Sequence, residues 1–77
     1  MEQINMIEII ADITLSAALS QLGLVSSGRE TRGFIENGLI SVNSLTVTKA
    51  DFIISYVPGN YTVIRRGKKK YALIVHL

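Results

Sequence analysis

The spacing of apolar residues in the first third of the chain predicts a helix over residues 15–22. Leucines and alanines recur there at intervals of three or four residues, which places them on one face of a helix. Asp12 or Thr14 offers a side-chain oxygen that can cap its start. Gly23 follows directly, and glycine is the residue that most often takes the positive φ with which helices end.

A second helix is expected to begin at Ser27. Ser27 and Glu30 have the S-x-x-E spacing of a capping box, in which each residue satisfies a backbone amide near the helix start. Gly38 supplies the matching stop. The inner side of this helix carries Thr31, Phe34 and Ile35, and at about 100° per residue the opposite, solvent-facing side carries Arg29, Arg32, Gly33 and Glu36.

After Gly38 the apolar period changes to two, which is typical of strands. Strand-like runs cover residues 40–42, 45–48, 52–57, 61–64 and 71–75. Asn43-Ser44 and Pro58-Gly59 are turn signals, and the last two runs flank a short Gly-containing segment, as in a hairpin. The order of elements predicts an α+β domain in which two helices pack on a small, mostly antiparallel sheet of about five strands.

Residues 1–11 fit no single element. Ile4, Ile7 and Ile10 recur every third residue, but Asn5 and Glu8 interrupt the pattern. A short strand, a helical turn and a linker are all compatible with this segment.

The basic residues are strongly segregated along the chain. Five of the eight Lys and Arg residues fall within residues 65–70, which is the predicted hairpin tip. The rest of the chain holds three basic and six acidic residues, so the formal net charge of +2 hides a tip of +5 on a domain of −3. Cations concentrated on a rigid scaffold are typical of a protein that binds a polyanion.

Composition excludes several classes of protein. The chain has no cysteine, so disulfides and thiolate metal sites are excluded, which fits a reducing compartment such as the cytoplasm. No apolar run approaches the roughly 20 residues of a membrane-spanning helix. Residues 1–10 contain no basic residue of the kind that begins a secretory signal. A chain of 77 residues suffices for one small domain.

We predict no catalytic residue, no metal ligand and no cofactor in this chain. His76 is the only histidine and has no acid or nucleophile near it in the sequence. The six carboxylates lack metal-ligand spacing. Gly67 is followed by lysines but lacks the G-x-x-x-x-G-K-[ST] spacing of a phosphate loop.

The candidate binding residues also have purely structural interpretations. The lysines could serve solubility alone, although solubility does not require adjacent cations. Arg29 and Arg32 could pair with the neighbouring glutamates on the helix surface. Tyr61 and Tyr71 could stack on bases, but tyrosines in strands more often pack against their neighbours.

Two segments of the chain resemble a known family. Residues 22–43 resemble the RNA-binding domain named after the fourth protein of the small ribosomal subunit, with a helix ending in Gly, Ser at the next helix start, an Arg-bearing helix, Gly and a Val-x-Val-Asn-type strand. Residues 61–73, with Arg65-Arg66-Gly67-Lys68-Lys69 at their centre, are similar to the C-terminal end of bacterial-type tyrosyl-tRNA synthetases. Together the two segments cover nearly all of residues 15–75.

The resemblance implies the fold known as the alpha-L motif and a role in binding RNA. In these synthetases the appended domain binds tyrosine tRNA near the anticodon stem and the variable arm, through contacts to the RNA backbone. The residues predicted to bind RNA here are Arg29, Arg32, Arg65, Arg66, Lys68, Lys69 and Lys70.

Three positions depart from the family pattern. Gly28 stands where the superfamily usually has a basic residue, Gly33 where the synthetases often have a second Arg, and Ser44 where Asn-Gly is usual. These changes weaken the helix half of the implied RNA surface. The hairpin is therefore expected to carry more of the binding.

The chain lacks the His-x-Gly-His and Lys-Met-Ser-Lys-Ser-type signatures of such a synthetase. The resemblance therefore implies an RNA-binding domain over residues 12–77, with a linker remnant at residues 1–11, and no enzyme activity in this chain. Its parent would be an ATP-dependent tyrosine–tRNA ligase of the cytoplasm that forms a homodimer through its catalytic domain. The rest of that synthetase would be a partner of this domain.

Two other interpretations stay open. A free-standing relative of the same superfamily would bind ribosomal RNA through the same surface. A protein-docking module would instead present the basic tip to an acidic partner and use the tyrosines as anchors.

Overall fold

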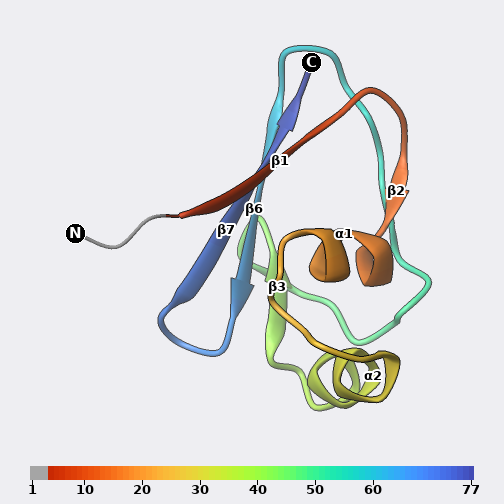
Figure 1. Ribbon diagram of the computed structural model, residues 1–77, viewed down its shortest axis with the longest axis vertical. Helices are drawn as coiled ribbons and strands as arrows, with labels where there is room; N and C mark the ends of the chain where they lie inside the picture. The colour runs from red at the N-terminus through yellow and green to blue at the C-terminus, as the bar shows by residue number, and fades with distance from the viewer. Residues whose placement is uncertain (1–3) are drawn as a thin grey trace.

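A five-stranded sheet forms one layer of the fold, and both helices lie on the same side of it (Figure 1). The computed structural model describes residues 4–77. The strand order is β1-β7-β6-β3-β4, in which β1 and β7 are parallel and the other pairs are antiparallel. These elements are β1 (Asn5–Ile9), α1 (Leu15–Gln21), α2 (Gly28–Glu36), β3 (Ile40–Val42), β4 (Leu45–Thr46), β6 (Tyr61–Arg66) and β7 (Lys70–His76). The predicted α+β class with a mostly antiparallel sheet is confirmed.

Both helices begin at residues that the sequence marks as caps. The Thr14 hydroxyl accepts a hydrogen bond from the Ala17 amide at 3.2 Å, and the Ser27 hydroxyl accepts one from the Glu30 amide at 3.1 Å. The return half of the capping box is shifted by one residue. The Glu30 carboxylate accepts from the amide and the hydroxyl of Ser26, at 3.1 and 3.0 Å.

Both helices also end in the same way. The amides of Gly23 and Leu24 donate to carbonyls of α1 at 3.1 and 3.0 Å, and those of Gly38 and Leu39 donate to carbonyls of α2 at 3.1 and 3.0 Å. This Schellman arrangement requires a left-handed residue, and both glycines have a φ of +72°. The chain therefore turns sharply after each helix, as the two Gly positions predict.

A separate two-stranded sheet pairs β2 (Ile13–Thr14) with β5 (Ile53–Ile54). The prediction of a strand over residues 52–57 is wrong for most of that run, because side chains take the backbone amides that follow β5. The Tyr56 amide donates to Asp12 Oδ1 at 2.7 Å, and the Val57 amide donates to His76 Nδ1 at 3.0 Å. Asp12 therefore anchors this loop, and Thr14 alone caps α1.

Residues 5–9 form the edge strand β1, which pairs with β7. Ile9 is buried, and its carbonyl accepts from the Leu77 amide at 3.0 Å. The Asn5 side chain donates to the Leu22 carbonyl at 2.8 Å. This part of the expected linker is thus a strand of the sheet rather than a frayed end, because its backbone finds partners in β7. Residues 1–3 lie outside the described residues, and a domain boundary at residue 12 stays a prediction.

The core lies between the helices and the face of the sheet that they cover. Its fully buried large side chains come from α1, the turn after it, α2 and three strands, namely Leu15, Leu19, Leu24, Ile35, Ile40, Ile64 and Ile74. Alternate residues of β6 and β7 face this core, so the residues between them face the other side of the sheet. We call that side the open face, since no described helix covers it. Within residues 4–77, no helix has the length and apolar character needed to cross a membrane.

Candidate nucleic-acid interface

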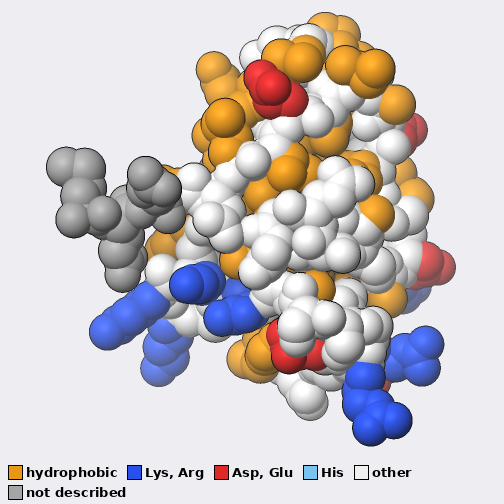
Figure 2. All heavy atoms as spheres, in the orientation of Figure 1, with side chains coloured by type: hydrophobic (Ala, Val, Ile, Leu, Met, Phe, Trp, Pro, Cys, Tyr) orange, Lys and Arg blue, Asp and Glu red, His pale blue; other side chains and the backbone are white. Residues whose placement is uncertain are grey.

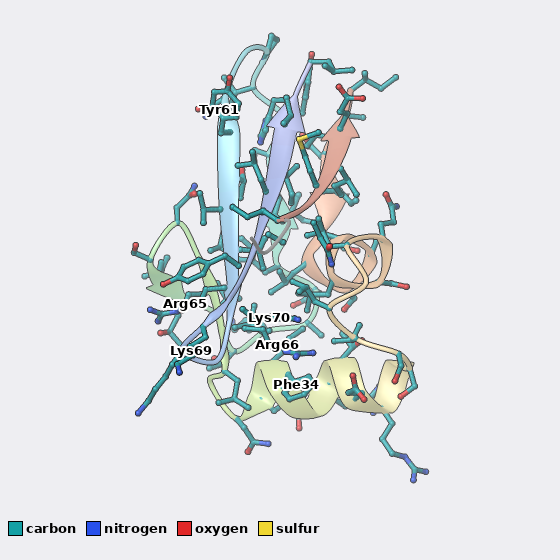
Figure 3. The ribbon with its side chains drawn as sticks, turned by 60° about the vertical axis from the view of Figure 1, so that its left-hand side comes forward. Phe34, Tyr61, Arg65, Arg66, Lys69 and Lys70 are labelled. Atoms are coloured by element: carbon teal, nitrogen blue, oxygen red, sulfur yellow. The ribbon has the colours of Figure 1, made fainter. Side chains whose placement is uncertain are left out.

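The hairpin of β6 and β7 divides the predicted basic residues between the two sides of the sheet. In its register Arg65 lies opposite Tyr71, and Arg66 lies opposite Lys70. Because neighbouring strand residues alternate, the first pair lies on the open face and the second on the helix side. Figure 3 shows this separation, with Arg65 and Lys69 pointing away from α2, whereas Arg66 and Lys70 point toward its side.

Arg66 ties the hairpin to the helices. Its guanidinium lies 5.2 Å from the centroid of the Phe34 ring on α2, which makes a cation–π contact. Its Nη1 donates to the carbonyl of Leu24, in the turn between the helices. The structure thus gives Arg66 an internal contact, and its binding to RNA stays a prediction.

Lys68, Lys69 and Lys70, which we call the tip lysines, are exposed at the end of the hairpin. Gly67 opens the turn with a φ of +68°, and its amide donates to the Leu39 carbonyl at 2.7 Å. This bond anchors the turn to the segment that follows α2. Three ammonium groups on an anchored turn repel one another, and an anion bound among them relieves that repulsion.

Arg65 lies half-buried on the open face. Its Nη2 donates to the Ser41 hydroxyl of β3 at 3.3 Å. A small pocket of about 80 Å³ adjoins it, lined by Ser41, Ser44, Val63, Arg65 and Tyr71. Arg65 is therefore a positioned cation, in contrast to the freely exposed tip lysines.

Arg29 and Arg32, which we call the helix arginines, are both exposed on α2, as the sequence predicts. They are three residues apart and so lie on neighbouring turns of the same side of the helix. Glu30, which could have paired with them, accepts two hydrogen bonds from Ser26 at the start of the helix. The carboxylate of Glu30 therefore serves the cap.

Two shallow grooves adjoin the helix arginines. One, of about 550 Å³, is lined mainly by small and polar residues of α1, of the turn before α2 and of the start of α2. The other, of about 490 Å³, is lined by Gly28, Arg29, Arg32, Gly33 and Glu36. Gly28 and Arg32 line both grooves, and a Cβ added at Gly28 or at Gly33 would meet no atom within 4 Å beyond the nearby backbone of its own helix. The surface of α2 thus leaves room for another backbone to approach the guanidinium groups.

Apart from Lys49, the basic side chains form two groups at the same end of the molecule. Figure 2 shows one group over the β6–β7 turn and the other over α2, with a patch of acidic side chains between them. The sequence predicted both groups, and only the fold brings them to one end. They are two separate patches rather than one continuous surface.

Tyr61 and His76 lie away from this end. Tyr61 is paired with Val75 at the far end of β6, so it lies away from the basic tip and cannot stack on a base bound there (Figure 3). His76 is only 2% exposed, its Nδ1 accepts from the Val57 amide, and its Nε2 lies 2.8 Å from the Thr62 hydroxyl. His76 is thus a strand residue whose two ring nitrogens both have partners.

Sequence reasoning missed the grooves and the grouping of Ser41 with Arg65 and Tyr71. The run of small residues before α2 was a signal for an open groove. The pairing of Arg65 with Tyr71 could have been found by counting outward from the centre of the turn. The position of Ser41 depends on the register of β3 against β6, which no local pattern reveals.

Comparison with known proteins connects these features to one family. A family model described as "Tyrosine--tRNA ligase SYY-like C-terminal domain" matches residues 1–74. Similar relatives include the tyrosine–tRNA ligases of Laribacter hongkongensis (39% identical over 61 residues), Bacillus pumilus (37% over 68) and Macrococcus caseolyticus (36% over 70). The matches cover 75%, 84% and 87% of this chain but only 14%, 16% and 17% of the relatives. The chain belongs to the family of SYY-like C-terminal domains of tyrosine–tRNA ligases.

Proposed function

We propose that this domain is the tRNA-binding module of a tyrosine–tRNA ligase and that it binds tyrosine tRNA near the anticodon stem and the variable arm. The observation that carries the proposal is the placement of five exposed cations, the helix arginines and the tip lysines, at one end of a domain whose remaining charge is negative. The family supports the choice of tRNA as the polyanion.

Binding proceeds through phosphate contacts. Each cation that neutralises a phosphate releases condensed counterions, and this release supplies most of the binding free energy. Duplex RNA is recognised largely by its shape and its 2′-hydroxyls, so the contacts at both patches need little sequence selectivity. The grooves beside the helix arginines let the RNA backbone come close to α2, while the tip lysines reach a second stretch of phosphates.

The two patches contribute unequally. The tip lysines supply three exposed cations and the helix arginines two. The hairpin therefore carries the larger share of the affinity. Arg65 adds a contact from the open face, whereas Arg66 supports the hairpin from inside.

The parent protein would supply the rest of the activity. Tyrosine activation with ATP and transfer to the tRNA belong to the part of the ligase that this chain does not span, and the homodimer would form there. This domain then adds affinity for the tRNA in the cytoplasm without taking part in the chemistry.

A salt titration tests the proposal. Affinity of the chain for a labelled tyrosine tRNA transcript is measured by fluorescence anisotropy between about 50 and 200 mM salt. Three to five phosphate contacts predict a slope of log K against log salt of about −2 to −4.5. Replacing the three tip lysines by Gln lowers the magnitude of the slope by about 2–3, and replacing the two helix arginines by Gln lowers it by about 1.4–1.8.

Lys49→Gln is the matched control, because Lys49 is exposed but belongs to neither patch. Its affinity for the tRNA transcript should stay within twofold of that of the wild type, because it loses one charge but no phosphate contact. A flat salt dependence, or equal losses for Lys49→Gln and for a single tip-lysine variant, contradicts the proposal. Equal affinity for ribosomal RNA fragments would favour the interpretation as a ribosomal-RNA-binding domain. Equal affinity for a tRNA with a short variable arm would contradict the assignment to tyrosine tRNA.

A further inference from the structure

The open face of the sheet carries exposed aromatic and apolar side chains. Tyr61, Val63 and Tyr71 are 59%, 42% and 47% exposed, and Met6 on β1 is 56% exposed. Alternation places all four on the side of the sheet away from α1 and α2. A contiguous apolar patch on a protein surface is a feature of interaction sites, whereas singly exposed apolar residues are ordinary, so a binding site on this face requires a polar group beside these side chains.

One position on this face combines an aromatic ring with a fixed cation. Arg65 of β6 lies directly opposite Tyr71 of β7, and Ser41 of β3 lies directly opposite Arg65 on its other side. The row Ser41–Arg65–Tyr71 therefore crosses three neighbouring strands. Side chains directly opposite on antiparallel strands are in contact range, about 5 Å between their Cβ atoms.

The small pocket of about 80 Å³ lies at this row and includes the hydroxyl-bearing Ser41 and Ser44 in its lining. A pocket of this size suits a phosphate group or the edge of a base. A nucleotide bound here would leave its base outside the pocket, where the exposed ring of Tyr71 lies.

The guanidinium of Arg65 is not fully satisfied within the fold. Its Nη2 bonds to Ser41, but its Nε is the one buried side-chain nitrogen or oxygen among residues 4–77 that has no hydrogen-bond partner. Leaving a buried donor unpaired is unfavourable, so an unpaired donor in a native fold is often part of a functional site. A ligand that accepts from this guanidinium and shifts it slightly can satisfy the remaining donor.

We propose that the Ser41–Arg65–Tyr71 row binds one unpaired nucleotide of an RNA loop or bulge. The base stacks on the ring of Tyr71, while Arg65 and the two serine hydroxyls bind the adjoining phosphate or base edge. Aromatic and guanidinium planes side by side are what proteins use to hold unstacked RNA bases. Lys69 points to the same side of the hairpin and adds a neighbouring phosphate contact (Figure 3).

This inference takes RNA as the ligand from the proposed function, but it places the binding on a different surface. The helix arginines and tip lysines bind RNA backbone whether or not it is paired. The open face selects an unpaired base. An apolar partner protein is less favoured as its occupant, because the buried donor and the nearby cation suit an anion.

The test compares a labelled single-stranded RNA oligonucleotide, the same oligonucleotide with abasic positions, and a blunt-ended, fully paired RNA duplex with the same number of phosphates. Tyr71→Leu should lower affinity for the first by about 5- to 150-fold, the range expected for loss of one stacked base. Its affinity for the abasic oligonucleotide and for the paired duplex should stay within twofold of the wild type. Tyr71→Phe keeps the ring and should restore binding to the first.

Tyr61→Leu is the matched control, because Tyr61 lies on the same face but at the far end of β6. It should bind all three probes like the wild type, and urea denaturation of each variant excludes misfolding. The inference is overturned if Tyr71→Leu binds the single-stranded probe normally, if Tyr61→Leu loses as much, or if the face instead mediates self-association that Tyr71→Leu abolishes. The proposed function is tested independently, by the salt titration and by the variants of the tip lysines and the helix arginines.

Discussion

Arg66 offers a direct way to separate a residue that supports the hairpin from one that binds RNA. The sequence groups it with four other cations of the tip, yet its guanidinium contacts Phe34 and the Leu24 carbonyl. We therefore expect Arg66→Ala to reduce stability first. Any effect on RNA binding follows from the loosened hairpin.

The size of the effect follows from the two contacts. A hydrogen bond from a charged donor contributes about 1.5–3 kcal/mol, and a cation–π contact at a partly exposed site contributes about 0.5–1 kcal/mol. Arg66→Ala also removes an apolar stem, so we expect a loss of about 3 kcal/mol, at the upper end of ordinary substitutions. For a domain of this size, such a loss lowers Tm by roughly 12–24 °C.

Urea denaturation followed by circular dichroism measures this loss. Arg66→Met keeps the long apolar stem and also removes the like charge opposite Lys70, so it should be less destabilising than Arg66→Ala. Arg66→Lys keeps the charge but not the planar guanidinium, and should recover only part of the stability. Lys69→Ala is the control and should change stability by less than about 0.5 kcal/mol.

RNA affinity, measured where each variant is fully folded, completes the experiment. If Arg66 acts from inside, the salt slope of Arg66→Met equals that of the wild type. Unchanged stability together with a slope smaller in magnitude by about 0.7–0.9 would show that Arg66 contacts a phosphate instead, and would refute the reasoning.

Three further predictions concern stability and can be checked by the same denaturation measurement. Gly33→Ala should stabilise the domain by about 1 kcal/mol, because Gly33 lies within α2 and an added Cβ has open space; a simultaneous loss of tRNA affinity would show that the RNA backbone approaches this position closely. His76→Leu should cost about 2–4 kcal/mol, because it leaves the Thr62 hydroxyl and the Val57 amide without their partner; a neutral result would mean that water replaces the imidazole. Asn43→Ala should cost about 1–2 kcal/mol, because the Val63 amide of β6 loses its acceptor and alanine must keep a φ of +49°. Asn43→Gly should cost less, because glycine adopts that φ freely.

The candidate site could be predicted from the sequence as a set of charges but not as a surface. Arg29 and Arg32 share an exposed helix side because the spacing of three residues determines it locally. Arg65 and Arg66 look equivalent in the sequence, yet one lies against Ser41 on the open face and the other against Phe34. The difference depends on which side of the sheet the helices cover.

Local signals determined the positions of the helices and the hairpin. Thr14 and Ser27 cap the helices, and Gly23 and Gly38 end them, through hydrogen bonds that span only a few residues. Such short-range preferences act before any tertiary contact forms, so a single sequence suffices to read them.

Only the tertiary structure decided the rest of the architecture and the division of roles among the cations. Residues 5–9 become a strand because β7 offers a parallel edge, and the chain leaves the strand conformation after β5 because Asp12 and His76 accept from the amides of Tyr56 and Val57. Both outcomes join segments more than 40 residues apart or depend on strand register, and no local pattern encodes such a partner. The sequence alone determined that this protein has two capped helices and a cationic hairpin, and the packing of the helices on one face of the sheet decided which cations remain free to bind.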